Sequence, residues 1–288
     1  MTNAHTSVAH ALLAIGNADI DAARQLIARA VEADPTAMLP RALANALADD
    51  SKVDVYAEPS GFEDFINNGG NPALYTATVD ALRAIHAQQR PGVFLDVGCG
   101  DGRVTFAVHD QNRLVELVEP SPALLDTAVS RFLQAGIDVT SWNMTAQEAL
   151  SSTEHSWDLV QSTFAMHALA PNERKHVLHA LAQRTTRLLI VEFDVPDFVD
   201  RSIEHAMYAA ATFENGLLEY TDHPQVHTDF LLPVLVNQFD PAKRRHTHEQ
   251  SAAAWKRDLV DAGWGTVDVQ PLADYWWAPA VLFDAQTN

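Results

Sequence analysis

The residues whose types and spacing point most directly to chemistry are Asp96 and the three glycines that follow it, Gly98, Gly100 and Gly102. Glycine has no Cβ, so a chain with glycine at alternate positions can turn tightly and let a ligand approach its backbone. The apolar run 93–97, which only Asp96 interrupts, predicts a buried parallel strand, and the residues after the turn have helical spacing. A strand, a glycine turn and a helix in this order predict a ligand site at the carboxyl end of the strand.

The spacing of the glycines differs from that of a dinucleotide site. In the pattern G-x-G-x-x-G counted from Gly98 the third glycine would fall at position 103, which is Arg103. Asp101 is expected in the first helical turn, where its charge would repel a phosphate. The turn therefore predicts a ligand without a phosphate group at this position.

The stretch 96–102, Asp-Val-Gly-Cys-Gly-Asp-Gly, resembles motif I of the class I S-adenosylmethionine (SAM) methyltransferases. In that family the turn wraps the amino-acid end of the cofactor, and the acid positions it through hydrogen bonds. The resemblance implies that Asp96, Gly98, Cys99 and Gly100 bind the cofactor. A tight structural turn without a ligand is the alternative interpretation.

A second acid, Glu119, lies about twenty residues further on, at the tip of the apolar run 114–118. Doubly wound folds place a carboxylate here, where it can accept hydrogen bonds from both ribose hydroxyls. The same resemblance implies a motif II acid at Glu119, with Pro120 beside it. An exposed loop glutamate is the alternative.

The resemblance implies further cofactor contacts after the third and fourth strands. Asn143 can hydrogen-bond the adenine amino group and Met144 can cover the ring, although Asn143 could equally be a helix cap. Thr163 and Phe164, in the exit of the fourth strand, would lie along the sulfonium.

The loop before the first strand adds Asn71 and Tyr75, which the resemblance places at the amino-acid end of the cofactor. The alternative is a plain loop and a packed tyrosine. For the reaction itself, an enzyme must hold a nucleophile in line with the methyl group, and it needs a general base only if the nucleophile starts protonated. His167, His227 and Tyr75 are the catalytic candidates, and a packing histidine is the alternative for His167.

The histidines do not predict a metal site. His223 and His227 are four residues apart, a spacing that can ligate zinc on one helix, but Pro224 lies between them. The sequence has no Cys-x-x-Cys pair, and we expect no metal.

The order of apolar runs predicts an α/β fold with a doubly wound, Rossmann-like sheet of about seven strands that ends in an antiparallel hairpin. Residues 1–50 are expected to add an N-terminal helical hairpin, as a cap or a dimer contact. Residues 51–288 would then form the SAM-binding domain, with an irregular connector over 51–72 and a lid insertion over 195–246. A bulge is expected near Pro279, because proline does not fit inside a central strand.

The composition and charge of the chain limit the classes of molecule that it is expected to bind. The chain has 288 residues and a formal net charge of −19, which opposes nucleic-acid backbones. One cysteine fits a reducing compartment, and the sequence shows neither a signal peptide nor an apolar run of the roughly 20 residues that a membrane span needs. We expect a cytoplasmic protein that acts on a small molecule, with no nucleic-acid or membrane partner, and that forms a homodimer if residues 1–50 supply the contact.

Three functions stay open at this point. The first is a SAM-dependent methyltransferase with a small-molecule acceptor. The second is an enzyme of the same fold that uses SAM for alkyl transfer or cyclises its aminobutyl chain, as azetidine-forming synthases do. The third is a SAM-binding regulator without catalysis.

Overall fold

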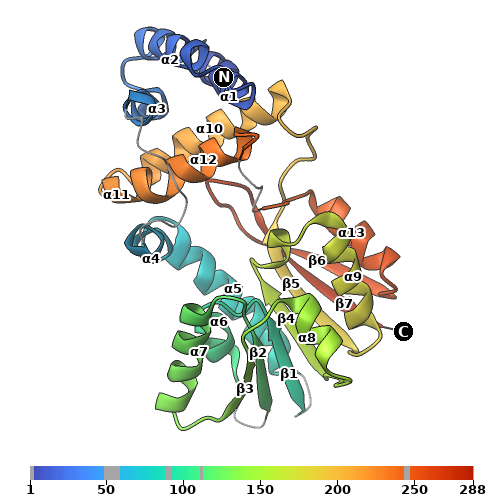
Figure 1. Cartoon of the computed structure of the whole chain (residues 1–288). Coiled ribbons are helices and arrows are strands. Elements are labelled where there is room, and N and C mark those ends of the chain that lie inside the picture. Colours follow the sequence, from blue (N-terminus) through green and yellow to red (C-terminus); the bar gives the residue numbers. More distant parts are fainter. Residues whose placement is uncertain (1–2, 49–58, 89–91, 111–112, 243–246, 288) are drawn as a thin grey trace. The chain divides into compact units, whose positions relative to one another are not determined.

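The structure is a computed structural model of the chain, and it describes residues 3–48, 59–88, 92–110, 113–242 and 247–287 (Figure 1). The chain divides into two compact units. The helical unit comprises residues 1–73, 197–245 and 275–278, and the sheet unit comprises residues 74–196, 246–274 and 279–288.

The sheet unit contains one seven-stranded sheet in the order β3-β2-β1-β4-β5-β7-β6. Its strands are β1 (Val93–Val97), β2 (Leu114–Val118), β3 (Val139–Trp142), β4 (Leu159–Thr163), β5 (Arg187–Phe193), β6 (Thr266–Ala273) and β7 (Ala280–Gln286). The first five strands pair in parallel, and β7 is antiparallel to both β5 and β6. The predicted doubly wound sheet with a closing antiparallel hairpin is therefore confirmed.

The central strands are almost continuously apolar because helices cover both faces of the sheet. One face packs on α5 (Asn71–His86), α6 (Arg103–Val108) and α7 (Pro122–Gln134) through a core that includes Phe94 and Phe132. The other face packs on α8 (Ala146–Ser152), α9 (Pro171–Ala182) and α13 (Ala252–Asp261) around Trp255 and Phe283. A short 3-10 turn, η1 (Met166–Ala168), follows β4.

The irregularity expected near Pro279 is present, but it lies in the strand opposite. Pro279 itself precedes β7, and its carbonyl accepts a hydrogen bond from the Asp194 amide at 2.8 Å. The register of β6 against β7 shifts between Pro271 and Ala273, which pair with Val281 and with Ala280, the residue after Pro279. Because β6 is the edge strand, Pro271 can lack an amide hydrogen there without removing a bond from the sheet interior.

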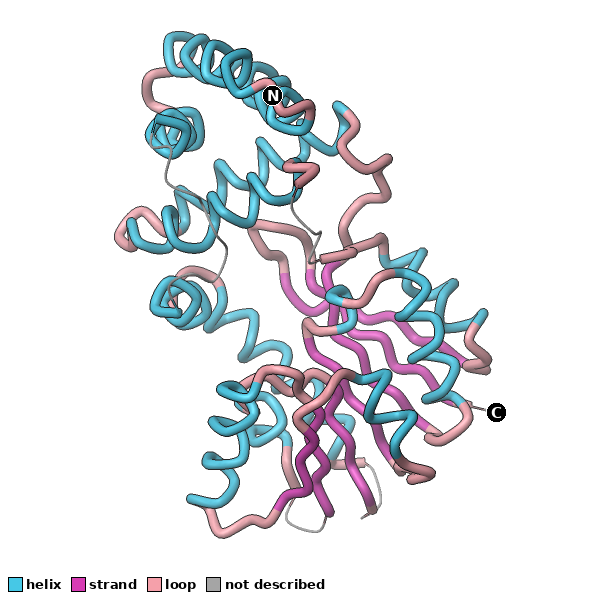
Figure 2. Tube along the Cα trace, viewed as in Figure 1, coloured by secondary structure: helices cyan, strands magenta, loops and turns pink. Residues whose placement is uncertain are grey.

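The helical unit contains α1 (Asn3–Gly16), α2 (Ile20–Ala33), α3 (Met38–Ala48) and α4 (Pro59–Asn67) from the first part of the chain, where two helices and an irregular connector were expected. Residues 51–58 of that connector lie outside the described residues. The 195–246 segment adds α10 (Ile203–Glu219), α11 (Pro224–Val226), the π-helix η2 (His227–Leu231) and α12 (Leu232–Phe239), while residues 243–246 are again outside the description. Figure 2 shows that the described part of this unit is helix and loop, and that the strands belong to the sheet unit.

Long-range contacts join the early and late helices of this unit. The carboxylate of Glu214 in α10 accepts hydrogen bonds from the backbone amides of Met38 and Leu39, each at 2.8 Å. These amides are in the first turn of α3 and have no partner within the helix, so Glu214 completes the helix start. A core that includes Leu12, Leu39, Phe213 and Leu235 fills the space between these helices.

Residues 275–278, between β6 and β7 in the sequence, also belong to the helical unit. A Cβ on Gly216 of α10 would lie 2.9 Å from the Trp276 ring, so the glycine allows the indole to pack directly on the helix. The Tyr208 hydroxyl donates to the Trp277 carbonyl at 2.6 Å. Of the helices described, none is long and apolar enough to cross a membrane.

Candidate functional site

The turn after β1 requires glycine at its three alternate positions. Gly98, Gly100 and Gly102 have φ angles of 73°, 56° and 72°, in the left-handed region that other residues adopt at a cost. A Cβ on Gly98 would collide with the Ala165 side chain, and one on Gly102 would lie 2.8 Å from the Cβ of Ala128. A Cβ on Gly100 would meet no described atom within 4 Å, so at this point the backbone is open to a ligand.

Asp96 lies at the carboxyl end of β1 and is 2% exposed. Its Oδ2 accepts hydrogen bonds from the Thr105 hydroxyl at 2.5 Å and from the Gln161 amide at 3.3 Å. Its Oδ1 is buried without a hydrogen-bond partner among the described residues. Burial raises the pKa of Asp96 to about 7, and the neighbouring Glu119 charge adds to this effect. Because a buried acceptor without a donor costs free energy, Oδ1 suits a donor that a ligand brings.

Glu119, directly after β2, anchors the turn from the next strand. Its Oε2 accepts from the Gly100 amide at 3.1 Å and its Oε1 accepts from the Ser121 amide at 2.9 Å. A carboxylate oxygen can accept two hydrogen bonds, so each oxygen retains capacity for a hydroxyl. Glu119 thus fits both the turn and the ribose contact expected of it.

Asn143 follows β3 and bonds back to the neighbouring strand exit. Its amide nitrogen donates to the carbonyls of Glu119 and Pro120 at 3.0 and 3.1 Å. The side-chain oxygen has no partner among the described residues and can accept from an amino group. Met144 is half-buried beside it and packs at the edge of the core that contains α8.

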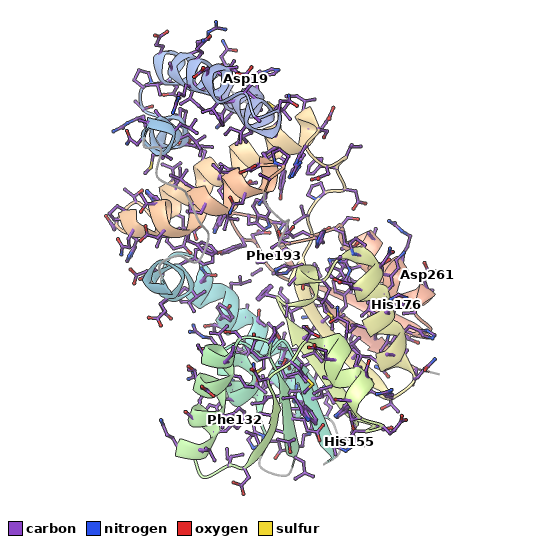
Figure 3. The ribbon with its side chains drawn as sticks, in the orientation of Figure 1. Asp19, Phe132, His155, His176, Phe193 and Asp261 are labelled. Atoms are coloured by element: carbon purple, nitrogen blue, oxygen red, sulfur yellow. The ribbon has the colours of Figure 1, made fainter. Side chains whose placement is uncertain are left out.

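The exit of β4 carries a strained aromatic residue. Phe164 has a φ of 51°, which is unusual for a bulky side chain and marks a segment held by its surroundings. Its ring stacks on Phe193 at 4.8 Å and meets the edge of Tyr75 at 6.0 Å. Figure 3 labels Phe193 at the end of β5. The Thr163 hydroxyl, one residue earlier, is buried without a partner in the described part of the chain.

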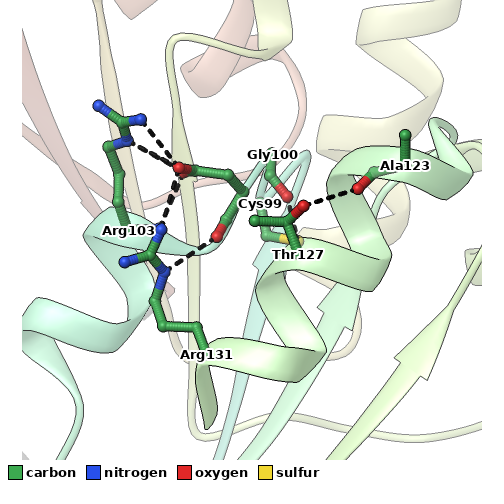
Figure 4. A network of polar contacts seen from close by, with 7 residues as sticks. Cys99, Gly100, Arg103, Ala123, Thr127 and Arg131 are labelled. Atoms are coloured by element: carbon green, nitrogen blue, oxygen red, sulfur yellow. Dashed lines mark hydrogen bonds and ion pairs between the residues drawn. The ribbon is translucent and has the colours of Figure 1, made fainter. Parts of the chain in front are cut away.

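The charge of Asp101 does not act as the sequence indicated. Asp101 precedes α6, and its carboxylate binds Arg103 at 2.9 Å and Arg131 at 3.1 Å (Figure 4). Two arginines therefore offset one aspartate, and the argument that Asp101 repels a phosphate was wrong. The Arg103 guanidinium also stands 5.7 Å from the centre of the Tyr75 ring. Sequence reasoning noted Arg103 only as a missing glycine and overlooked it as a site residue.

Two other predicted residues of the sheet unit carry protons at neutral pH. Burial raises the pKa of the Tyr75 hydroxyl and the pKa of the Cys99 thiol. The Cys99 sulfur lies 3.6 Å from the Gly100 carbonyl, within the turn. Neither group is an anion under ordinary conditions, so Tyr75 can act as a hydrogen-bond donor but not as a ready base.

His167, in η1, forms an ion pair with Glu192 of β5. The His167 Nδ1 lies 2.8 Å from one Glu192 oxygen, and the His167 amide donates to the other at 3.0 Å. Burial by itself lowers the pKa of His167, but the charge and hydrogen bond of Glu192 outweigh it and raise the pKa to about 9. His167 is therefore protonated at neutral pH.

The remaining predicted residues lie in the helical unit. Asn71 is buried, and its amide nitrogen donates to the Phe65 carbonyl at 2.7 Å and the Tyr220 hydroxyl at 2.6 Å, while its oxygen accepts from Tyr275 at 3.1 Å. These bonds commit most of its side chain to the fold. His227 lies at the start of the π-helix, where burial lowers its pKa, and its Nε2 is buried without a partner among the described residues.

Metal ligands are not gathered in this chain as far as it is described. No group of three or more His, Cys, Asp or Glu side chains within the described ranges could hold a metal ion.

Comparison with known proteins identifies the class of domain. Residues 94–187 match the family model of a methyltransferase domain. The fold resembles that of magnesium protoporphyrin IX methyltransferase from Synechocystis PCC 6803 with bound S-adenosylhomocysteine (SAH), at 13% identity and a TM-score of 0.51, over 80% of this chain and 94% of that one. It also resembles an O-methyltransferase family protein from Burkholderia thailandensis, at 15% identity and a TM-score of 0.52, over 87% of this chain and 62% of that one. None of the functionally curated proteins matches the sequence.

The family match shows a methyltransferase domain over residues 94–187, and the sheet has the fold of the SAM-dependent methyltransferases named above. The Synechocystis methyltransferase of this fold was solved with bound SAH, so S-adenosylmethionine is the cofactor against which the residues of this site are compared. The residues at the carboxyl ends of the strands fit it, since an acid with an unpartnered oxygen, an open glycine backbone and a second acid after β2 lie on adjacent strands.

Proposed function

We propose that the protein transfers a methyl group from SAM to a small-molecule acceptor. The observation that carries the cofactor assignment is the buried, unpartnered Oδ1 of Asp96 beside the open backbone of Gly100. In this proposal Asp96, Gly98, Cys99 and Gly100 hold the amino-acid end, with Tyr75 and Thr163 as donors nearby. Asn71 is the first residue of α5 and would contribute through its backbone, because its side chain is committed to other hydrogen bonds.

On the same proposal Glu119 and Pro120 hold the ribose, and the free oxygen of Asn143 accepts from the adenine amino group. Met144 covers the ring, and Phe164 lines the sulfonium side. When bound, SAM supplies a methyl group already activated by the sulfonium. The protein must then orient the nucleophile and exclude water.

The role of His167 depends on the acceptor. Glu192 holds a proton on Nδ1, and a neutral His167 can take a second proton at Nε2 from an acceptor hydroxyl or amine. With a pKa of about 9, only a small fraction is neutral at pH 7. For an acceptor that starts protonated, the rate should rise with pH until His167 has lost its proton. An acceptor that is already a nucleophile needs no such base.

The acceptor is proposed to be small because the chain carries a net charge of −19, which disfavours nucleic acids. We assign the acceptor wall and lid to the 195–246 insertion with the N-terminal helices. The insertion follows β5 directly, and long connections at the carboxyl ends of doubly wound sheets commonly serve function. Its partly buried aromatic residues, such as Phe230, suit a mostly apolar pocket, and His227 offers one polar group, whereas Tyr220 is fully buried in the core of the helical unit.

The decisive experiment incubates the protein with SAM, with and without a pool of candidate acceptors, and identifies the products by mass spectrometry. SAH formed only with an acceptor supports the proposal. A cyclised product with methylthioadenosine, formed without an acceptor, indicates the SAM-cyclising alternative. SAM that stays unchanged in both arms while it binds the protein indicates a regulator. Glu119→Ala is the matched control, because its weaker cofactor binding should reduce each signal when SAM is supplied near the dissociation constant of the wild type.

A further inference from the structure

A buried hydrogen-bond network connects Arg113, His86 and Gln161 to Asp96. Arg113, just before β2, lies with its Nη1 3.1 Å from the His86 Nδ1 and donates from Nη2 to the His86 carbonyl at 2.9 Å. The His86 Nε2 lies 3.0 Å from the Gln161 oxygen, and the Gln161 nitrogen lies 3.3 Å from Asp96 Oδ2. His86, Gln161 and Asp96 are at most 2% exposed and Arg113 is 6% exposed, so water does not compete for these bonds.

The chemistry of these side chains fixes which group donates and which accepts in each hydrogen bond of the network. Arginine can only donate hydrogen bonds, so the Nδ1 of His86 must accept and its proton must lie on Nε2. Burial lowers the pKa of His86 to about 4, which keeps it neutral. His86 then donates to the Gln161 oxygen, and Gln161 must turn its amide hydrogens towards Asp96. Each bond therefore sets the orientation of the next.

We propose that Arg113, His86 and Gln161 are positioning residues that keep a donor on Oδ2 of Asp96, so that Oδ1 stays ionised and free for the amino-acid end of the cofactor. This inference rests on the proposed role of Asp96. Without the hydrogen bonds of Arg113 and His86, Gln161 could present its oxygen to the Asp96 carboxylate, and two acceptors would then face each other. Asp96 would respond by retaining its proton.

The charges around Asp96 explain why a donor matters there. The nearby Glu119 carboxylate and burial both favour the protonated acid, whereas the Thr105 hydroxyl and the Gln161 amide favour the anion. The Cys99 thiol and His86 are neutral, and the Arg113 charge lies beyond His86. Thr105 and Gln161 are thus the main groups that oppose protonation of Asp96, and the orientation of Gln161 depends on the hydrogen-bond network.

The test measures SAH affinity by calorimetry from pH 5.5 to 8.5 on the full chain. In the wild type, affinity should rise with pH to a midpoint near 7, because a cationic amino group requires the Asp96 anion. His86→Phe retains the ring against Phe94 but removes both bonds. It should move the midpoint up by about one pH unit and weaken binding at pH 7 about fivefold. His86→Gln can accept from Arg113 and donate to Gln161, and it should restore the wild-type midpoint.

Thr78→Val is the matched control. Thr78 lies in the same helix, is fully buried, and its hydroxyl has no partner among the described residues, so the variant should leave the midpoint unchanged. If His86→Phe does not fold, Arg113→Met releases His86 to change tautomer and should shift the midpoint in the same direction. A midpoint that stays in place while affinity falls equally at every pH would show a merely structural role and overturn the inference.

A second readout separates this inference from the proposed function. Carbon-13 NMR follows the titration of Asp96 in the ligand-free protein. A raised Asp96 pKa in His86→Phe, together with absent SAH binding in the wild type, supports the positioning role of Arg113, His86 and Gln161 but overturns the cofactor assignment. An Asp96 pKa that is unchanged in His86→Phe, together with SAH binding by the wild type, overturns the positioning role of Arg113, His86 and Gln161 alone.

Discussion

The ion pair between His167 and Glu192 makes the stability of the fold depend on pH in a defined range. A histidine in an unfolded chain has a pKa near its ordinary value of 6.5, whereas His167 in the folded protein has a pKa of about 9. A raised folded pKa stabilises the fold fully below pH 6.5, and this contribution is lost as pH rises through 9. One pKa unit is about 1.4 kcal/mol, so the loss is about 3 kcal/mol.

The assay is urea unfolding at several pH values between 6 and 10, for the wild type and for His167→Gln. The free energy of unfolding of the wild type should fall by about 3 kcal/mol more than that of the variant across this range. Glu192→Gln should also flatten the wild-type curve, because it removes the charge that holds the proton on His167. The absolute stability of either variant is not the readout, since each leaves a buried partner behind.

Other groups also titrate in this range, but their contribution to the pH dependence of stability is the same in each variant and cancels in the comparison. Asp96, with a pKa of about 7, loses its own contribution as pH rises to that value, and it does so in every variant. His176→Gln, on the exposed side of α9, is the control and should retain the wild-type slope (Figure 3). If His167→Gln keeps the full pH dependence between 7 and 9, the assignment of the proton to this pair is refuted.

Three further predictions follow from the site. Glu119→Ala should weaken SAM binding by about 1–3 kcal/mol in calorimetry, because it removes the acceptor for the Gly100 amide and the ribose; unchanged affinity would contradict this role. Gly98→Ala should abolish SAM binding and lower stability by more than Gly136→Ala, since both glycines have a φ of 73° but a methyl group collides only at position 98; equal thermal shifts would argue against the collision. His227→Ala should reduce turnover at least severalfold while SAM affinity stays within twofold, and a parallel loss of both would count against a role confined to the acceptor.

The sequence alone was sufficient to predict those features that depend on residues close together along the chain. An apolar run ending in alternate glycines encodes a buried strand and a left-handed turn, because the requirement for glycine at 98, 100 and 102 arises within a few residues. The spacing to Glu119 follows from the length of one helix and one strand, so it too can be read along the chain. The seven strands and their doubly wound class were predictable for the same reason, although boundaries such as the start of β7 were not.

Tertiary structure decided which side chains meet, because the partners lie on different elements and no periodicity relates them. His86 reaches Asp96 only through Gln161, which is 75 residues away from it in sequence. Arg131, 30 residues from Asp101, helps to offset the charge that the local sequence left exposed. His167 retains its proton because of the Glu192 carboxylate, which only the pairing of β4 with β5 brings within 2.8 Å. Burial and pairing set these charges, and both are properties of the folded chain.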